Sequence, residues 1–142
     1  MSGNLIFVLN LGVTLFLTGL IWTIQLVHYP SFYFVDRERF KEFHIFHSKR
    51  ISILVVPLMI FELISSGILW WESSAFSLNS LGFYLVIAIW ISTAAFSVPA
   101  HNKLSSEMDK KTIRILVNTN WIRTLLWTIK ASIGVYFLSL SL

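Results

Sequence analysis

The four histidines of this 142-residue chain are its strongest candidates for chemistry. One follows the first apolar segment, two precede the second and one follows the third: His28, His44, His47 and His101. His44 and His47 are three residues apart, so they share a face if their segment is helical. Antiparallel packing of the segments would gather the four imidazoles in one layer. Helix bundles build metal sites from such side chains, which predicts an iron, copper or zinc site.

Glu62 is a second candidate, because it lies about eleven residues into the second apolar segment. A carboxylate at that depth is costly to bury, and such residues usually mark a functional path. We expect Glu62 to be catalytic, by handling protons or completing a coordination sphere. Its depth relative to the histidines argues against direct ligation of a metal held by them. The alternative is that Glu62 is protonated, or paired with Lys130 or Arg123, and only fixes helix packing.

Polar side chains also repeat along the other apolar segments, at intervals of three or four residues. We expect Arg123 to have a catalytic role and, with Asn120, to position an anionic or carbonyl-bearing substrate. Further substrate contacts are expected from one amide and three aromatic residues: Gln25, Tyr29, Trp121 and Trp127. The alternative is that the polar residues only join neighbouring helices and that the tryptophans only pack.

Haem is an alternative cofactor, with His28 and His101 as an axial pair from two segments. It ranks below a non-haem metal because Gly12 and Gly19, which could make room for it, lie far from His28. If the histidines do no chemistry, we expect them at a membrane interface, bonded to lipid headgroups or to one another.

The composition indicates an integral membrane protein. Hydrophobic residues make up 56% of the chain and charged residues 13%, with a mean hydropathy of +0.73. A soluble domain carries about 25% charged residues, so this chain has too little charge for a water-facing surface or for disorder. The absence of cysteine excludes disulfides, thiolate-held metals and cysteine nucleophiles. The net charge of +4 could suit nucleic acid, but the positions of the charges favour a membrane surface.

Four segments are long enough to cross a bilayer, which takes roughly 20 apolar residues each. They cover about 5–27, 51–71, 81–100 and 125–142. They predict a single all-α domain over 1–142, an integral membrane four-helix bundle. A signal peptide is the competing interpretation of 5–27, but no lysine or arginine precedes that segment.

The basic residues predict the orientation. Ten of the eleven lie in the connectors between segments one and two or between three and four, and none lies at the N-terminus or in 72–80. By the positive-inside rule, both basic connectors face the cytoplasm and both termini face outward. We therefore expect a multi-pass protein of a bacterial inner membrane.

Several local signals describe the connectors. Aromatic and charged residues interleave between spans one and two, which predicts an amphipathic helix that lies in the interface or extends span two. Pro30 is expected to break the first span at His28–Tyr29, and Pro99 to kink the third near His101. Ser106 or Asp109 is expected to cap a long fourth helix.

Two groups of motifs carry a resemblance. The first is His28-Tyr29-Pro30, followed by residues 43–47 and by Pro57-Leu58-Met59 with Glu62; the second is residues 99–104, followed by 120–124 and Trp127. Together they resemble small four-span bacterial membrane proteins. The second group is also similar to the C-terminal part of the anthrone-oxygenase-like family, at Pro99, Asn102, Leu104, Trp121 and Arg123. That similarity implies oxidation of an aromatic or lipid-like substrate by O₂. The histidine set lies outside the family's pattern.

We therefore expect a membrane-embedded oxidoreductase with a histidine-bound metal near the cytoplasmic face. Its lipophilic or aromatic substrate would enter sideways from the lipid bilayer, and it would work as a homo-oligomer or within a larger membrane complex, without nucleic acid. The first alternative is a non-catalytic haem- or quinone-binding protein or accessory subunit of an electron-transfer complex. The second is a small channel or transporter with Glu62 as its coupling site.

Overall fold

The computed structural model describes residues 2–74 and 77–140, and every regular element in them is helical. In chain order the elements are α1 (Ser2–Thr23), η1 (Ile24–His28), α2 (Tyr29–Ser31), η2 (Phe32–Phe34), α3 (Arg37–Trp71), α4 (Leu78–Ser92), η3 (Thr93–Ser97), α5 (Val98–Leu104) and α6 (Lys110–Ser139). The described part of the chain contains no strand. The predicted all-α class is confirmed.

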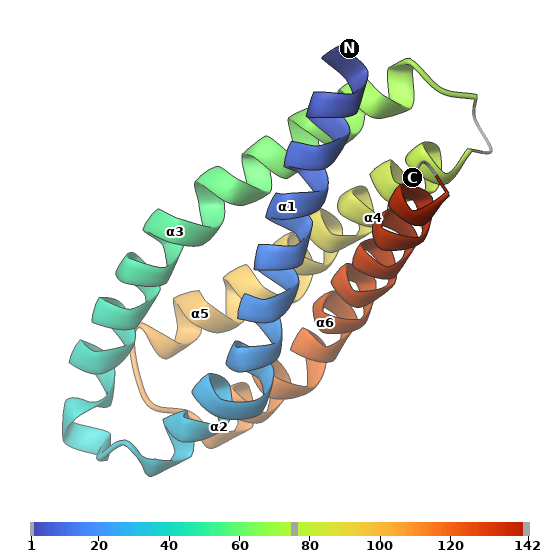
Figure 1. Ribbon diagram of the computed structural model, residues 1–142. Helices are drawn as coiled ribbons and strands as arrows, with labels where there is room; N and C mark the ends of the chain where they lie inside the picture. The colour runs from blue at the N-terminus through green and yellow to red at the C-terminus, as the bar shows by residue number, and fades with distance from the viewer. Residues whose placement is uncertain (1, 75–76, 141–142) are drawn as a thin grey trace.

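The helices pack as four antiparallel rods (Figure 1). They are α1 with its continuation through α2, then α3, then α4 with its continuation through α5, and finally α6. Each rod packs against two others, because α1 contacts α3 and α6 while α4 contacts the same two helices. The start of α1, the turn between α3 and α4 and the end of α6 lie at one end of the bundle. The two basic connectors lie at the other end.

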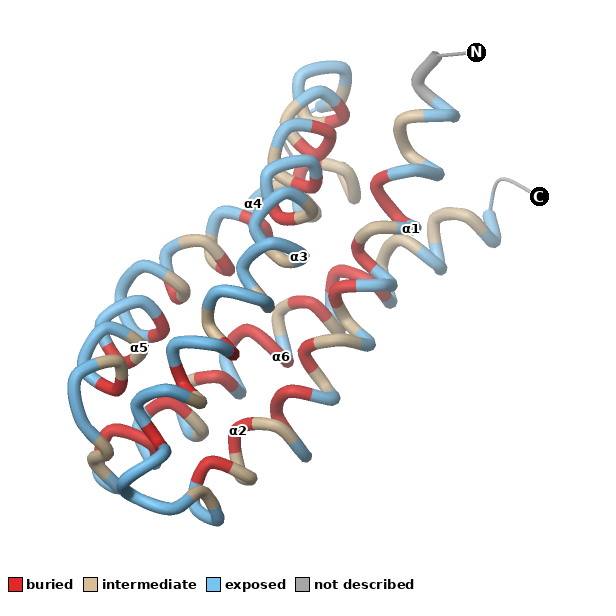
Figure 2. Tube along the Cα trace, turned by 90° about the vertical axis from the view of Figure 1, so that its left-hand side faces the viewer, coloured by how far each residue is buried: buried red, intermediate tan, exposed pale blue. Residues whose placement is uncertain are grey.

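Three helical stretches are long and apolar enough to cross a membrane: Asn4–Phe34, Arg37–Trp71 and Leu78–Leu104. Buried and exposed positions alternate along every long helix (Figure 2), and many exposed ones carry large apolar side chains. These features indicate a membrane protein. The predicted fourth span ends on residues 141–142, which lie outside the described residues. Over its described length, α6 is not among the three stretches.

Each basic connector contains the start of the next long helix: α3 begins at Arg37 and α6 begins at Lys110. Residues 37–50 form the first turns of α3, so this segment is continuous with the second predicted span. Of the two predicted caps, Asp109 is the one at the start of α6, where its side chain accepts a hydrogen bond of 3.0 Å from the backbone N–H of Lys111. Lys103 and Thr112 also donate to this carboxylate at 2.6 Å. These hydrogen bonds, that from Lys103 foremost, lower the pKa of Asp109.

Pro30 was expected to break the first helix at His28–Tyr29; the helix type changes there, from the π-helical turn η1 to α2, while helical structure continues to Phe34. A proline lacks an N–H, and its ring clashes with the carbonyl four residues before it in an α-helix. Here a wider π-helical turn, η1, ends two residues before Pro30 and accommodates the ring. The π-helical turn η3 ends two residues before Pro99 in the same way. Such insertions change the face that the following residues present, and they are frequent at functional sites.

Candidate functional site

The four histidines lie together at the end of the bundle where the basic connectors lie, as two bonded pairs. His28 Nε2 lies 2.7 Å from His47 Nδ1, and their ring centroids are 4.0 Å apart. His44 Nε2 lies 3.0 Å from His101 Nδ1. The ring centroids of His47 and His101 are 6.2 Å apart, so the two pairs adjoin. We call these four side chains the histidine cluster.

Two hydroxyl groups extend the second pair into a chain. Ser105 Oγ lies 3.2 Å from His44 Nδ1, and Tyr29 Oη lies 3.0 Å from His101 Nε2. Both ring nitrogens of His44 and His101 therefore have a partner, whereas Nε2 of His47 is buried without one. A neutral imidazole donates through one nitrogen and accepts at the other. Ser105, His44, His101 and Tyr29 therefore form one continuous hydrogen-bonded chain, at the end of which Ser105 Oγ donates to the backbone carbonyl of His101 at 2.9 Å.

Phe32 packs edge-on against the histidine cluster. Its ring is fully buried and lies within 20° of perpendicular to those of His28, His44 and His47, at centroid distances of 5.3 to 5.8 Å. The short turn η2, which carries Phe32, follows α2 directly and brings this ring back under the cluster. The cluster is thus fixed by packing on one side and by hydrogen bonds on the other.

The two histidine pairs offer nitrogen donors for a metal ion. Two nitrogens bound to one zinc ion at about 2.1 Å lie roughly 3.4 Å apart in a tetrahedral site. The nitrogens of the His28–His47 pair and the His44–His101 pair are slightly closer, at 2.7 and 3.0 Å. Each pair could therefore supply two metal ligands if its two facing nitrogens moved slightly apart. Among residues 2–74 and 77–140, no three ligand-type side chains form a group that could hold one ion.

Arg123 is buried beside the cluster and is held by amides. Its Nε donates to Asn120 Oδ1 at 3.1 Å, and its Nη2 donates to the same oxygen. Asn120 in turn donates to Gln25 Oε1 at 2.8 Å, and Gln25 donates to the backbone carbonyl of Val117 at 3.1 Å. Asn120, which Gln25 holds in place, therefore fixes the orientation of the guanidinium.

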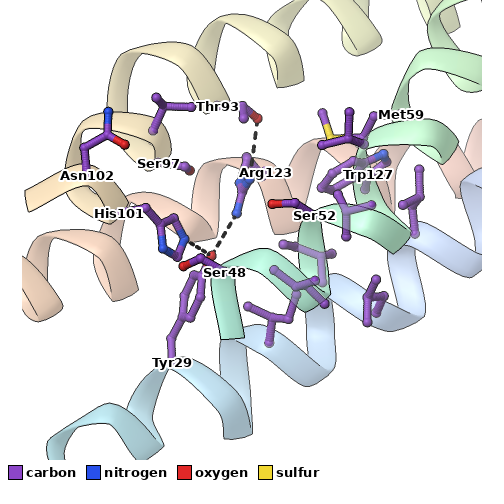
Figure 3. A pocket seen from close by; sticks show the side chains of 18 residues that line it. Tyr29, Ser48, Ser52, Met59, Thr93, Ser97, His101, Asn102, Arg123 and Trp127 are labelled. Atoms are coloured by element: carbon purple, nitrogen blue, oxygen red, sulfur yellow. Dashed lines mark hydrogen bonds between the residues drawn. The ribbon is translucent and has the colours of Figure 1, made fainter. Parts of the chain in front are cut away.

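The free side of the guanidinium faces a cavity of about 300 Å³ (Figure 3). Arg123 makes only long contacts there, 3.5 Å from Nη2 to Tyr29 Oη and 3.5 Å from Nη1 to Thr93 Oγ1. His101 lies at the same end of the cavity, whereas Met59 and Trp127 lie at the other. The complete lining is Leu17, Leu20, Ile21, Ile24, Tyr29, Ser48, Ile51, Ser52, Val55, Val56, Met59, Thr93, Ser97, Val98, His101, Asn102, Arg123 and Trp127.

The cavity opens sideways, between α3 and α5. The lining residues that are exposed on the bundle surface are Ser52 and Val56 of α3 and Val98 and Asn102 of α5. Both π-helical turns contribute to the wall: Ile24 comes from η1, and Thr93 and Ser97 come from η3.

The sequence-predicted substrate residues are only partly at the cavity. Tyr29 and Trp127 line it, as do His101 and Arg123. Gln25 and Asn120 are buried behind Arg123 and do not line it. Trp121 lies outside, 38% exposed, with its ring 5.6 Å from that of Trp22.

Glu62 is buried in a separate polar cluster that contains no histidine. Lys130 Nζ lies 3.0 Å from Glu62 Oε1, and Thr14 donates to the same oxygen at 2.7 Å. Trp127 Nε1 donates to Glu62 Oε2 at 3.0 Å. Lys130 also donates to Asn10 Oδ1 at 3.0 Å and to Thr14. This arrangement matches the packing alternative for Glu62, in which Lys130 is its partner; a role in proton handling stays a prediction.

The sequence interpretation missed Ser48 and Ser52, which line the cavity. A signal for them was present, because His44, Ser48 and Ser52 follow one another at intervals of four and so share one helix face. Ser105, which bonds to His44, had no comparable signal, since its approach depends on how α5 packs against α3.

No known family model matches the chain, and no curated protein or solved structure matches it either. The resemblance to the anthrone-oxygenase-like family therefore stays a prediction.

Proposed function

We propose that this protein is a membrane-embedded oxidoreductase that takes a lipophilic molecule from the bilayer into the lateral cavity and acts on it beside the histidine cluster. The single observation that carries the proposal is the polar end of the cavity. There Tyr29, His101 and Arg123 converge in a pocket whose remaining walls are mostly apolar. Ligand pockets typically combine an apolar lining with a few convergent polar groups.

The chain's own residues have distinct tasks in this proposal. Arg123 and Tyr29 bind the polar head of the molecule, while Trp127 and the aliphatic wall exclude water from its apolar part. His101 exchanges a proton with Tyr29 Oη, to which it is already hydrogen bonded, and His44 and Ser105 continue this path toward the end of the bundle. In line with the distribution of basic residues, this end faces the cytoplasm of a bacterial inner membrane, and both termini face outward.

The redox centre we propose is a transition metal, iron or copper, bound by the histidine cluster. The pairs His28–His47 and His44–His101 would each offer two nitrogens. A bound metal would supply the electron transfer that side chains cannot, and the buried, unpartnered Nε2 of His47 is a further donor close by. Haem ranks lower, because Gly12 and Gly19, the small residues of α1 that could make room for it, lie far along the helix from His28.

Elemental analysis and an absorption spectrum of the detergent-purified protein test this proposal. We expect a stoichiometric transition metal in the wild type and its loss in the double variant His44→Ala/His47→Ala. The control is Lys49→Ala, a change at an exposed position of the same helix, which should retain the metal. Less than about 0.2 metal per chain, unchanged in the double variant, would contradict the metal centre. A Soret band would favour haem instead.

A non-catalytic quinone-binding or accessory subunit is the second candidate. The observation that favours it is that the facing nitrogens of each histidine pair lie at hydrogen-bond distance, 2.7 Å for His28–His47 and 3.0 Å for His44–His101. Such a subunit should co-purify with larger membrane partners and carry an extractable quinone. Isolation as a metal-bearing protein without partners would exclude it.

A further inference from the structure

Arg123 is a buried cation without an anionic partner. Its side chain is 6% exposed. The two ion pairs of the described residues are Lys103–Asp109 and Lys130–Glu62, and Arg123 belongs to neither. Guanidinium groups stay protonated in proteins, so the charge cannot be removed by loss of the proton. Burying a charge without a counter-ion is costly, which makes this residue exceptional within the bundle.

No acidic side chain of the bundle is placed to compensate it. Both oxygens of Glu62, the one carboxylate deep in the bundle, are occupied by Lys130, Thr14 and Trp127. The remaining acidic residues lie in or beside the turns and helix ends: Asp36, Glu38, Glu42, Glu72, Glu107 and Asp109. The contacts that Arg123 does make are to neutral groups, and the two that face the cavity are 3.5 Å long.

A second polar group on the same cavity also lacks a partner. The hydroxyl of Ser48 is buried and makes no hydrogen bond within the described part of the chain. Buried hydroxyls are nearly always hydrogen bonded, so an unpartnered one calls for an explanation. Ser48 and Arg123 line one cavity from different helices, α3 and α6.

We propose that the cavity binds a single-chain anionic amphiphile, with its carboxylate or an equivalent oxyanion on Arg123 and its tail leaving between Val56 and Val98. This inference rests on the proposed function and narrows its substrate class from lipophilic molecules in general to monoanions. The volume of about 300 Å³ is at the lower end of the range for ligand pockets, too small for the headgroup and glycerol backbone of a two-chain lipid. The exposed apolar mouth lets the tail continue into the bilayer.

Binding of parinaric acid and of its methyl ester tests the charge. The two probes share one tail and differ in the head, and both report binding by energy transfer from tryptophan. At pH 8 in non-ionic detergent we expect the purified protein to bind the acid about tenfold or more tightly than the ester, as one hydrogen bond to a charged group predicts. Val56→Trp, which fills the mouth, should abolish binding of both.

Variants of Arg123 test whether the guanidinium causes the preference for the acid over the ester. Arg123→Gln should lose the preference for the acid, while Arg123→Lys, which keeps the charge, should retain most of it. Arg114→Gln removes an exposed arginine of the same helix and should change nothing. If Arg123→Gln does not fold, as judged by helix content and gel filtration, the wild-type comparison and Arg123→Lys still decide the matter.

The outcomes separate this inference from the proposed function. Equal binding of acid and ester, blocked by Val56→Trp, would overturn the anion while leaving the lateral cavity as a binding site. Binding of neither probe would overturn both. Displacement of the acid by myristate but not by phosphatidylglycerol supports a single-chain anion. Displacement by phosphatidylglycerol alone would show that the site holds a phospholipid headgroup and would overturn the single-chain assignment.

Discussion

The indole of Trp127 joins the two polar regions of the bundle, because its Nε1 donates to Glu62 Oε2 at 3.0 Å while its ring lines the cavity that Arg123 faces. Trp127 is 1% exposed, so this link is shielded from solvent and lipid. The ion pair of Glu62 and Lys130 therefore lies directly behind one wall of the cavity. Its integrity sets the position of the indole, and through the indole the shape of the cavity.

Breaking this ion pair from one side should destabilise the protein strongly. Glu62→Gln leaves the charge of Lys130 uncompensated, and Lys130→Met does the same to Glu62. Removal of one partner of a buried pair costs about 3–5 kcal/mol. The double variant should cost much less than the sum of the two, because no isolated charge remains. Thermal unfolding in detergent measures these differences.

Lys103→Met provides the matched control for this cycle. It removes one partner of the exposed ion pair with Asp109 and should leave the unfolding temperature nearly unchanged. Additive effects of Glu62→Gln and Lys130→Met would show that the two side chains do not depend on each other, contrary to the 3.0 Å contact.

The parts of the structure that the sequence predicted depend on patterns along single segments and on the antiparallel packing of those segments. The depth of Glu62 and the cap at Asp109 follow from hydropathy and spacing within one segment. The layer of histidines follows from the ends of the segments at which they lie, and the pairing of Glu62 with Lys130 was one of several alternatives. The π-helical turns before Pro30 and Pro99 did not, because a proline equally permits a helix end, a kink or an inserted residue. Which of these forms depends on packing against neighbouring helices.

The sequence also did not predict which residues line the cavity. Tyr29 and Trp127 belong to polar or aromatic lines that were recognised, but the rotation of α6 decides that Trp127 faces inward while Trp121 faces outward. A six-residue separation turns a helix through about 600°, so these two side chains differ by roughly 120° in direction. Sequence spacing gives that difference but not which of the two faces the core.

Replacing Pro99 by alanine should impair the cavity without unfolding the helix. The alanine restores an N–H at position 99 and removes the ring that opposes a regular helix, so η3 can relax to an α-helical turn. Loss of the inserted residue would turn the preceding side chains by about 100° relative to those that follow. Thr93 and Ser97 would then leave the cavity wall, and binding of parinaric acid should weaken several-fold with helix content retained.

Pro57 offers the control for this experiment. It lies inside α3 without an accompanying π-helical turn, so Pro57→Ala changes no helical register. We expect this variant to bind the probe as the wild type does. Unaltered binding by Pro99→Ala would mean that η3 is held by packing alone.

The cap of α6 should make stability depend on pH. The pKa of Asp109 is lowered in the folded protein, chiefly by Lys103, so its carboxylate stabilises the fold above the unfolded-state pKa of about 3.9. That contribution is lost as the pH falls through the lower folded-state value. The difference in unfolding temperature between the wild type and Asp109→Asn should therefore be present at pH 7 and shrink toward pH 3. A difference that grows on acidification would contradict the assignment.

Asn120 gives the sharpest test of the charge at Arg123, because the amide can be exchanged for a carboxylate of the same shape. In Asn120→Ala the guanidinium keeps its charge but loses the oxygen that orients it, so parinaric acid should bind about tenfold more weakly and still better than its ester. In Asn120→Asp the protein supplies the missing counter-ion itself, and Gln25 can donate to the new carboxylate only by giving up its hydrogen bond to the carbonyl of Val117. We expect this variant to be more stable to heat than Asn120→Ala and to lose its preference for the acid, which titration with the two probes measures directly. Retention of that preference by Asn120→Asp would mean that the bound anion does not contact Arg123.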